Sequence, residues 1–229
     1  MLKKIAIALS LFVPAVCAAE QVVCIHGFMG WRSKMLPIAK HLRDDGHYVR
    51  IWGYDSRAKK TACHSDDLVR YLNYLAKQKP GVKISFVTHS FGALLVRSAT
   101  NHPDCPKEAK RGRAVLIAPP NKGCKFGRIA GKWQLVQATM GDYSGKELIE
   151  SSAEDIEKLG AFPRKMSLLV IAGRSWINPI LREPNDGLLK IKETRLDQPH
   201  KHVIIDSNHD SLLSTRDTLD VTREFFITN

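Results

Sequence analysis

The sequence of 229 residues has little of what several protein classes depend on. Aromatic residues make up 7% of it, glycine and proline number 15 and 11, and no internal repeat or low-complexity linker occurs. With apolar residues at 44% and charged residues at 25%, the composition excludes a disordered, collagen-like or coiled-coil chain. Beyond the N-terminus, no segment has the roughly 20 apolar residues of a membrane-spanning helix. We therefore expect one globular domain.

Acidic residues are scarce relative to basic ones, 23 against 35, so the formal net charge is +12. A basic surface attracts anionic partners, and we expect peripheral contact with an anionic membrane surface. Four cations, Lys107, Lys110, Arg111 and Arg113, cluster without any nucleic-acid-binding motif. We therefore expect no nucleic acid partner, and we expect a monomer.

The N-terminus has the three parts of a secretory signal peptide. Lys3 and Lys4 precede the apolar run 5–13, and small residues follow Pro14. The apolar run is too short for a membrane anchor, and the residues before Cys17 do not suit a lipoprotein cleavage site. We expect 1–19 to be removed after Ala18 or Ala19, which lowers the net charge to +10. The domain 20–229 would then be periplasmic or secreted.

Cysteine is rare, with five residues, of which one lies in the expected signal peptide. Cys24 is in an apolar run and is expected to be a buried thiol. An exported chain can form at most one disulfide among Cys63, Cys105 and Cys124. The cysteine spacing matches no zinc site, so we expect no metal.

Short apolar runs alternate with helical patterns along the domain. The six runs predicted as buried strands are 21–25, 48–52, 82–87, 114–118, 168–172 and 202–206. Helices are predicted at 92–99 and 212–226. A further helix is predicted from the spacing of Leu68, Tyr71, Leu72 and Leu75. Asp66 and Asp67 are expected in its first turn and Lys77 and Lys79 in its last, which suits the helix dipole. This alternation predicts an α/β fold: about six mostly parallel strands, covered by helices on both faces. Its ligand site is expected beyond the carboxyl ends of the strands.

The segment 121–159 interrupts this alternation. It is the longest stretch without a strand, and its apolar residues are interspersed with Lys122, Lys125, Arg128 and Lys132. The pattern indicates a partly helical, amphipathic segment. Two interpretations stay open: a small cap over the site, or a helical excursion packed on the body.

The segment 88–92, Thr-His-Ser-Phe-Gly, follows a predicted strand and precedes a predicted helix. A serine between small residues at such a turn is typical of a nucleophile elbow, which exposes its hydroxyl above the sheet. We therefore predict Ser90 as the nucleophile, although Thr88 replaces the first glycine of the usual pattern. The alternative is a serine that caps an ordinary strand–helix turn. His89 is expected to pack beneath the elbow.

The segment 26–30, His-Gly-Phe-Met-Gly, closes the first predicted strand. Two glycines let its backbone approach a substrate closely. We predict that the N–H of Phe28, together with the N–H of Phe91 after the serine, forms an oxyanion hole.

A serine nucleophile needs a base and a carboxylate that orients the base. Asp186 and His209 follow Ser90 in the chain order of this type of sheet, and both are in loops that leave carboxyl ends of strands. We predict Ser90, Asp186 and His209 as a catalytic triad. Asp206 and Asp210, which flank the histidine, are alternatives for the carboxylate, and Asp197 is a weaker one.

These motifs resemble those of the α/β-hydrolase superfamily, and within it small bacterial lipases and esterases. The resemblance is carried by 26–27, 88–92, 185–187, 208–209 and the Pro-Asn-Lys-Gly loop in 116–123, and it spans nearly the whole domain. It implies a minimal α/β-hydrolase fold and ester hydrolysis by Ser90, Asp186 and His209 without a cofactor. Cys124 departs from the pattern, because relatives often have serine there. Some lipases of this kind bind calcium, but this sequence has no acidic cluster that would hold the ion.

The function expected from these features is that of a secreted serine esterase or lipase acting through an acyl-enzyme on a small-molecule or lipid ester. An acyltransferase or a thioesterase with the same triad is the alternative, and a catalytically dead binding protein is a further one. Met29 and Trp133 are predicted to bind substrate, and Phe28, Phe91 and Trp176 are further apolar candidates. The absence of a long inserted lid favours small or medium esters.

Overall fold

The fold is described from a computed structural model of residues 20–175 and 178–228, so the expected signal peptide lies outside the described residues. Six strands form one sheet in the order β2-β1-β3-β4-β5-β6, and all neighbouring strands are parallel. The strands are β1 Gln21–Ile25, β2 Tyr48–Trp52, β3 Ile84–His89, β4 Arg113–Ile117, β5 Ser167–Gly173 and β6 Lys201–Ile205. The predicted α/β fold is confirmed, and β1 and β2 have the predicted bounds.

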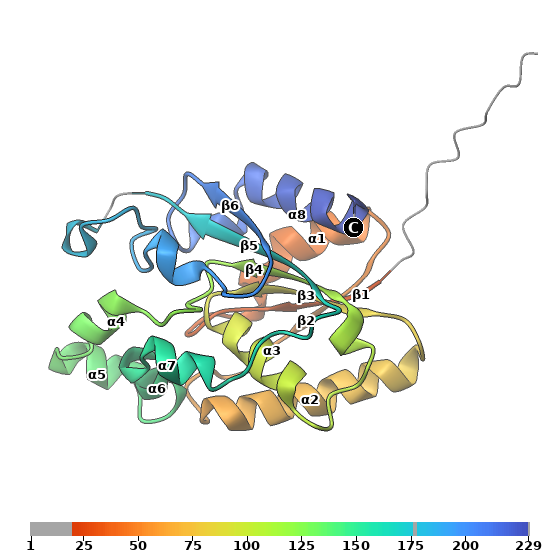
Figure 1. Cartoon of the computed structure of the whole chain (residues 1–229), viewed down its shortest axis with the longest axis horizontal. Helices are drawn as coiled ribbons and strands as arrows, with labels where there is room; N and C mark the ends of the chain where they lie inside the picture. Colours follow the sequence, from red (N-terminus) through yellow and green to blue (C-terminus); the bar gives the residue numbers. More distant parts are fainter. Residues whose placement is uncertain (1–19, 176–177, 229) are drawn as a thin grey trace, which may run out of the picture.

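Helices cover both faces of the sheet (Figure 1). The four long helices are α1 Leu36–Asp44, α2 Thr61–Gln78, α3 Phe91–Asn101 and α8 Arg216–Thr228. Val22 and Cys24 of β1 belong to the core cluster shared with α1 and α8, whereas Val23 and Ile25 belong to the cluster shared with α2 and α3. Because successive side chains of a strand point to opposite faces, a strand buried on both faces is a continuous apolar run.

The other predicted boundaries differ from the structure, and the predicted helix 212–226 is divided into a 3₁₀ helix at 211–213 and α8. Two of the differences have a clear physical reason. Strand β3 begins two residues later than expected, because Val82 donates its N–H to the Lys79 carbonyl in the turn that ends α2. Helix α2 begins at Thr61, so Asp66 and Asp67 do not lie in its first turn. The prediction failed because the N–H of Thr61 donates to the carboxylate of Glu147, 2.8 Å away and distant in the sequence.

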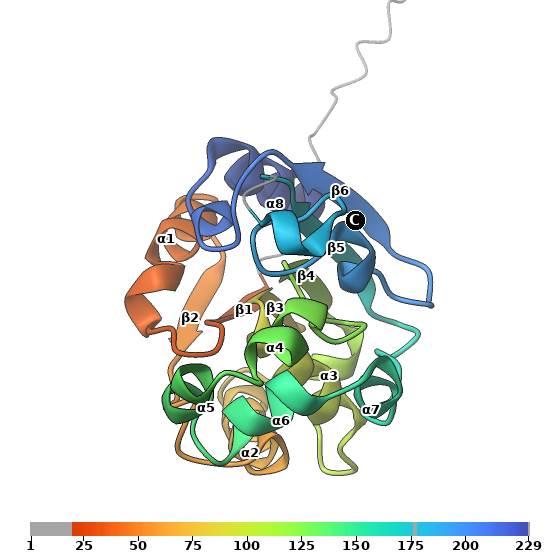
Figure 2. The same ribbon diagram turned by 90° about the vertical axis from the view of Figure 1, so that its left-hand side faces the viewer.

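The segment 121–159 contains four short helices, which lie near one another at one side of the fold (Figure 2). They are α4 Lys125–Ala130, α5 Gln134–Met140, α6 Ser144–Glu150 and α7 Ala153–Glu157. Helix α5 has no buried residue. The described residues also form five short 3₁₀ helices: η1 Arg32–Met35, η2 Ala109–Arg111, η3 Pro179–Leu181, η4 Ile191–Thr194 and η5 Ser211–Leu213.

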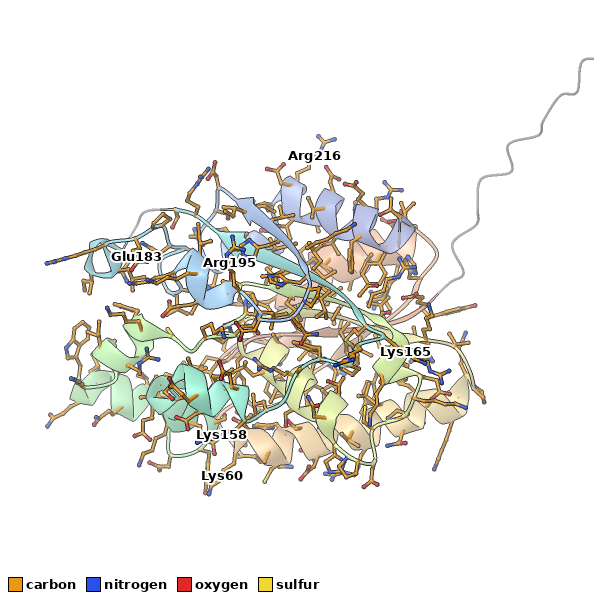
Figure 3. All side chains as sticks on the ribbon, viewed as in Figure 1. Lys60, Lys158, Lys165, Glu183, Arg195 and Arg216 are labelled. Atoms are coloured by element: carbon orange, nitrogen blue, oxygen red, sulfur yellow. The ribbon has the colours of Figure 1, made fainter. Side chains whose placement is uncertain are left out.

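Arg113 is not part of a solvated basic cluster with its neighbours in the sequence, because the structure buries it. Its Nε lies 3.3 Å from the buried carboxylate of Glu20, which also accepts the hydroxyl of Ser85. Its Nη1 donates to the carbonyls of Phe225 and Phe226 at the end of α8, at 3.0 and 2.6 Å. A buried charge requires such partners, and these bonds tie β3, β4 and the residue that precedes β1 to the last helix. Other cations, such as Lys60, Lys158 and Arg216, extend from the surface (Figure 3).

The thiols of Cys24, Cys63, Cys105 and Cys124 are all free. Cys24 is buried, as predicted, and burial raises the pKa of its thiol to about 12. Cys124 is also buried, and its Sγ accepts the N–H of Gly127 at 3.1 Å at the start of α4. The three cysteines considered for a disulfide therefore form none in this structure.

Candidate active site

Ser90 lies in a strained turn between β3 and α3. Its φ of 49° and ψ of −120° are unusual for a residue with a side chain. Its N–H donates to the Ile117 carbonyl of β4 at 2.8 Å. A Cβ at Gly92 would lie 2.8 Å from the His26 carbonyl oxygen and 2.9 Å from that of Ile25, so only glycine allows α3 to start this close to β1.

The turn at 27–30 lies directly beside the elbow. A Cβ at Gly27 would be 3.1 Å from the Cβ of Ser90, and the N–H of Gly30 donates to the Gly27 carbonyl at 3.1 Å. The rings of Phe28 and Phe91 meet edge to face, with centroids 6.1 Å apart. Within the described residues, the N–H groups of Phe28 and Phe91 donate to no other protein group. Both N–H groups are therefore free to bind a substrate oxygen.

Asp186 and His209 are in direct contact. His209 Nδ1 lies 2.7 Å from Asp186 Oδ2, and the N–H of His209 donates to the Asp186 carbonyl at 2.9 Å. The other carboxylate oxygen accepts the N–H groups of Leu188 and Leu189, at 2.9 and 2.7 Å. Asp186 is 1% exposed. A buried carboxylate held in this way favours the proton on Nδ1, which leaves Nε2 of His209 able to accept a proton.

The alternative carboxylates have other partners. Asp206 pairs with Arg174 at 2.6 Å, Asp210 pairs with Lys34 at 2.8 Å, and Asp197 pairs with Lys122. All three are largely exposed at the side chain. The carboxylate that contacts His209 is therefore that of Asp186.

Ser90 and His209 line the same cavity, whose volume is about 380 Å³. No hydrogen bond joins their side chains within the described residues, and such bonds often tighten only when substrate is present. Much of the lining is apolar: Phe28, Met29, Phe126, Val136, Met140, Leu148, Ile149, Leu188 and Leu189. The cavity thus brings the hydroxyl of Ser90 and the imidazole of His209 together beside an apolar wall.

The structure separates the predicted substrate-binding residues. Met29 and Phe28 line the cavity, whereas Trp133 precedes α5, is 53% exposed and is not among the lining residues. Phe91 packs in the core, and Trp176 lies outside the described residues. Sequence reasoning missed Val136 and Met140 as lining residues, although their i, i+4 spacing places them on one face of a helix.

His89 packs beneath the elbow, as expected, and it also contacts His209. Its Nε2 lies 3.0 Å from the His209 carbonyl oxygen, and the two ring centroids are 4.8 Å apart. Burial, assisted by the nearby His209, lowers the pKa of His89 to about 3. The ring is therefore neutral, and Nε2 donates its proton to the carbonyl. This bond anchors the backbone carbonyl of His209, whereas the backbone N–H of His209 is bound to Asp186.

Among the described residues, no group of three or more His, Cys, Asp or Glu side chains is arranged to hold a metal ion. A search of these residues also finds no helix with the length and apolarity to cross a membrane.

The sheet order and the elbow define the α/β-hydrolase fold, and solved structures of that fold match the chain. The mature form of lipase BlEst2 from Bacillus licheniformis matches with a TM-score of 0.76 at 17% identity, covering 91% of this chain and 92% of that one. The product of gene lin2722 from Listeria innocua matches at 0.68 and 17% identity, over 92% and 95%. The esterase Pf2001 from Pyrococcus furiosus matches at 0.60 and 16% identity, over 93% and 83%.

By sequence, residues 18–116 match the family described as "Putative serine esterase (DUF676)". This match includes the turn at 27–30 and the elbow at Ser90, and it ends before Asp186 and His209. None of the curated proteins matches the sequence. The chain is thus an α/β-hydrolase-fold protein that resembles lipases and esterases in structure.

Burial of His89 makes the stability of the protein depend on pH. The side chain has an ordinary pKa of 6.5 in the unfolded chain and of about 3 in the folded protein, so the unfolded state binds the proton more readily. Its contribution to stability is fully present above pH 6.5, and it is lost as the pH falls from there toward 3. We expect His89→Asn to reduce the pH slope of the free energy of unfolding by up to about 1.4 kcal/mol per pH unit below pH 6, measured by urea unfolding. Parallel curves for the two proteins would contradict this.

Proposed function

We propose that the protein is a serine hydrolase that cleaves carboxylic esters, with Ser90 as nucleophile, His209 as base and Asp186 as the carboxylate that orients it. The observation that carries the proposal is the buried Asp186–His209 pair at the same cavity as the elbow serine. The match of 18–116 to a serine esterase family supports it.

The geometry supports a two-stage reaction. His209 Nε2 takes the hydroxyl proton of Ser90 as Oγ bonds to the carbonyl carbon, and Asp186 stabilises the imidazolium through Nδ1–H. The N–H groups of Phe28 and Phe91 bind the oxyanion of the tetrahedral intermediate. The ester C–O bond then breaks, and His209 gives its proton to the leaving alcohol. In the second stage, His209 takes a proton from a water molecule as its oxygen bonds to the acyl carbon. The bond between this carbon and Ser90 Oγ then breaks, the acid is released, and His209 returns the proton to Oγ.

The acyl chain is proposed to bind along the apolar wall of the cavity. Five of the apolar lining residues belong to the segment 121–159, and we propose that this segment serves as the cap of the site: Phe126, Val136, Met140, Leu148 and Ile149. A volume of about 380 Å³ is that of about a dozen groups of water size, at ~30 Å³ each. Such a cavity suits a small or medium acyl chain.

Substitutions at the triad test the reaction. Ser90→Ala removes the nucleophile, so we expect no ester hydrolysis and no labelling by a fluorophosphonate probe. Asp186→Asn leaves the imidazole in the wrong tautomer, so kcat is expected to fall about 10⁴-fold. Asp206→Asn, at an exposed ion pair, is the matched control and should change kcat by less than about threefold. Undiminished hydrolysis by Ser90→Ala would refute the proposal.

A panel of esters tests the acyl site and the leaving group. With nitrophenyl esters from acetate to palmitate, we expect the highest kcat/KM between butyrate and octanoate. Val136→Trp narrows the cavity and should shift the optimum to shorter chains, whereas Leu135→Trp, 79% exposed on the same helix, should not. An optimum at palmitate would contradict the cavity argument. Faster turnover of matching thioesters, or transfer to added alcohols in preference to water, would identify a thioesterase or an acyltransferase instead.

Export and contact with an anionic membrane surface are proposed from the basic charge and the N-terminal pattern. Domain 20–229 retains a net charge of +10, and Trp133 is exposed next to Lys132 within the proposed cap. In fractionated cells, we expect a processed chain beginning at Ala19 or Glu20 that sediments with the envelope at low salt and is released at high salt. An unprocessed cytoplasmic chain, or envelope binding insensitive to salt, would contradict this proposal.

A further inference from the structure

The proposed oxyanion donor Phe28 is followed by a residue in a strained conformation. Met29 has φ of 52°, in the left-handed region that a residue with a side chain seldom adopts. Its N–H donates to the hydroxyl of Ser56 at 2.8 Å. Within the described residues, this is the one hydrogen bond that joins positions 28–30 to another part of the chain, since the bond of Gly30 is internal to the turn.

Ser56 is in the loop between β2 and α2, and it is 3% exposed. Its carbonyl accepts the hydroxyl of Ser144, the first residue of α6. Ser144 is fully buried, and its N–H donates to the Lys59 carbonyl at 3.2 Å. The loop between β2 and α2 is therefore hydrogen-bonded both to the turn at 27–30 and to the proposed cap.

The ring of Phe28 is held separately from its backbone. A Cβ at Gly145 of α6 would lie 2.6 Å from Cζ of Phe28, and the Phe91 ring meets the Phe28 ring edge to face. These contacts place the side chain of Phe28. The N–H of Phe28 shares a peptide with the Gly27 carbonyl, which accepts the N–H of Gly30 at 3.1 Å and lies 2.9 Å from Nδ1 of His26. The direction of this N–H therefore depends on the closed turn 27–30, in which Met29 is anchored by its hydrogen bond to Ser56.

We propose that Ser56 is a positioning residue for the oxyanion hole. By accepting the N–H of Met29, its hydroxyl keeps the strained turn closed and the N–H of Phe28 directed into the cavity beside Ser90. Ser144 supports Ser56 from α6, which couples the proposed cap to the oxyanion hole. This inference rests on the proposed hydrolase function.

The first test is the kinetics of Ser56→Ala with nitrophenyl butyrate. Removal of a whole oxyanion donor lowers kcat about 10²–10³-fold, so a misdirected donor should lower kcat about tenfold. KM should change by less than about twofold, because ground-state contacts of the acyl chain remain. Ser56→Thr, which keeps a hydroxyl, should recover most of the rate.

Variants of two further serines are compared with Ser56→Ala. Ser144→Ala should lower kcat less than Ser56→Ala does, and the double variant should be no slower than Ser56→Ala alone, because both act through one contact. Ser65→Ala is the matched control: this hydroxyl is 2% exposed and donates to the Thr61 carbonyl of its own helix at 3.0 Å. Its kcat should equal that of the wild-type protein.

A boronic acid provides a readout that a general loss of packing would not change. It forms a tetrahedral adduct with Ser90 Oγ, whose oxygen occupies the oxyanion position. We expect its inhibition constant in Ser56→Ala to rise by the same factor as kcat falls, while inhibition by the butyrate product is unchanged.

The positioning role is overturned if Ser56→Ala keeps the wild-type kcat, if only KM changes, or if Ser65→Ala loses rate equally. If Ser56→Ala does not fold, Ser144→Ala and Ser56→Thr decide the matter. A Ser144→Ala protein with unchanged kcat and boronic acid inhibition overturns the coupling, and an inactive folded Ser56→Thr protein overturns the role of the hydroxyl. Activity that persists in Ser90→Ala would instead refute the proposed function itself.

Discussion

The strained backbone of Ser90 is the constraint on which the site depends. A positive φ at a residue with a side chain costs on the order of 1–3 kcal/mol, and it persists only where the surroundings determine it. Here the Ser90 N–H is bound to the Ile117 carbonyl of β4, and Gly92 lets α3 start against the carbonyls of β1. Three neighbouring strands thus hold one hydroxyl at their common carboxyl edge. The turn at 27–30, which carries the proposed oxyanion donor Phe28, is at the same edge because Gly27 lies against the elbow.

Buried polar side chains hold the remaining backbone of the site. His89 binds the His209 carbonyl, Asp186 accepts two N–H groups of its own loop, and Ser56 accepts the N–H of Met29. Each group is shielded from water, where a satisfied hydrogen bond is strong and an unpaired group is costly. The loops that carry the proposed reaction are therefore fixed by the body of the protein, although loops usually vary and move more than strands.

Much of the fold was predictable because the sheet is parallel and buried on both faces. Each strand is then a short apolar run, and the bounds of β1 and β2 were predicted to the residue. Predictions failed where a distant partner decides the local structure. Helix α2 begins at Thr61 because Glu147 accepts its N–H, and Arg113 is buried because Glu20 and the end of α8 satisfy its guanidinium. Neither partner is close in the sequence.

The sequence by itself determined the alternation of strands and helices, the strand–serine–helix turn, and the order of serine, aspartate and histidine at the ends of strands. These features are local, because apolar periodicity and turn residues act over a few positions. Only the tertiary structure decided that Asp186, rather than Asp206 or Asp210, contacts His209, and that the cavity is lined by Val136 and Met140 rather than by Trp133. The physical reason is that distances between loops are set by the order in which strands pair, which no single segment encodes.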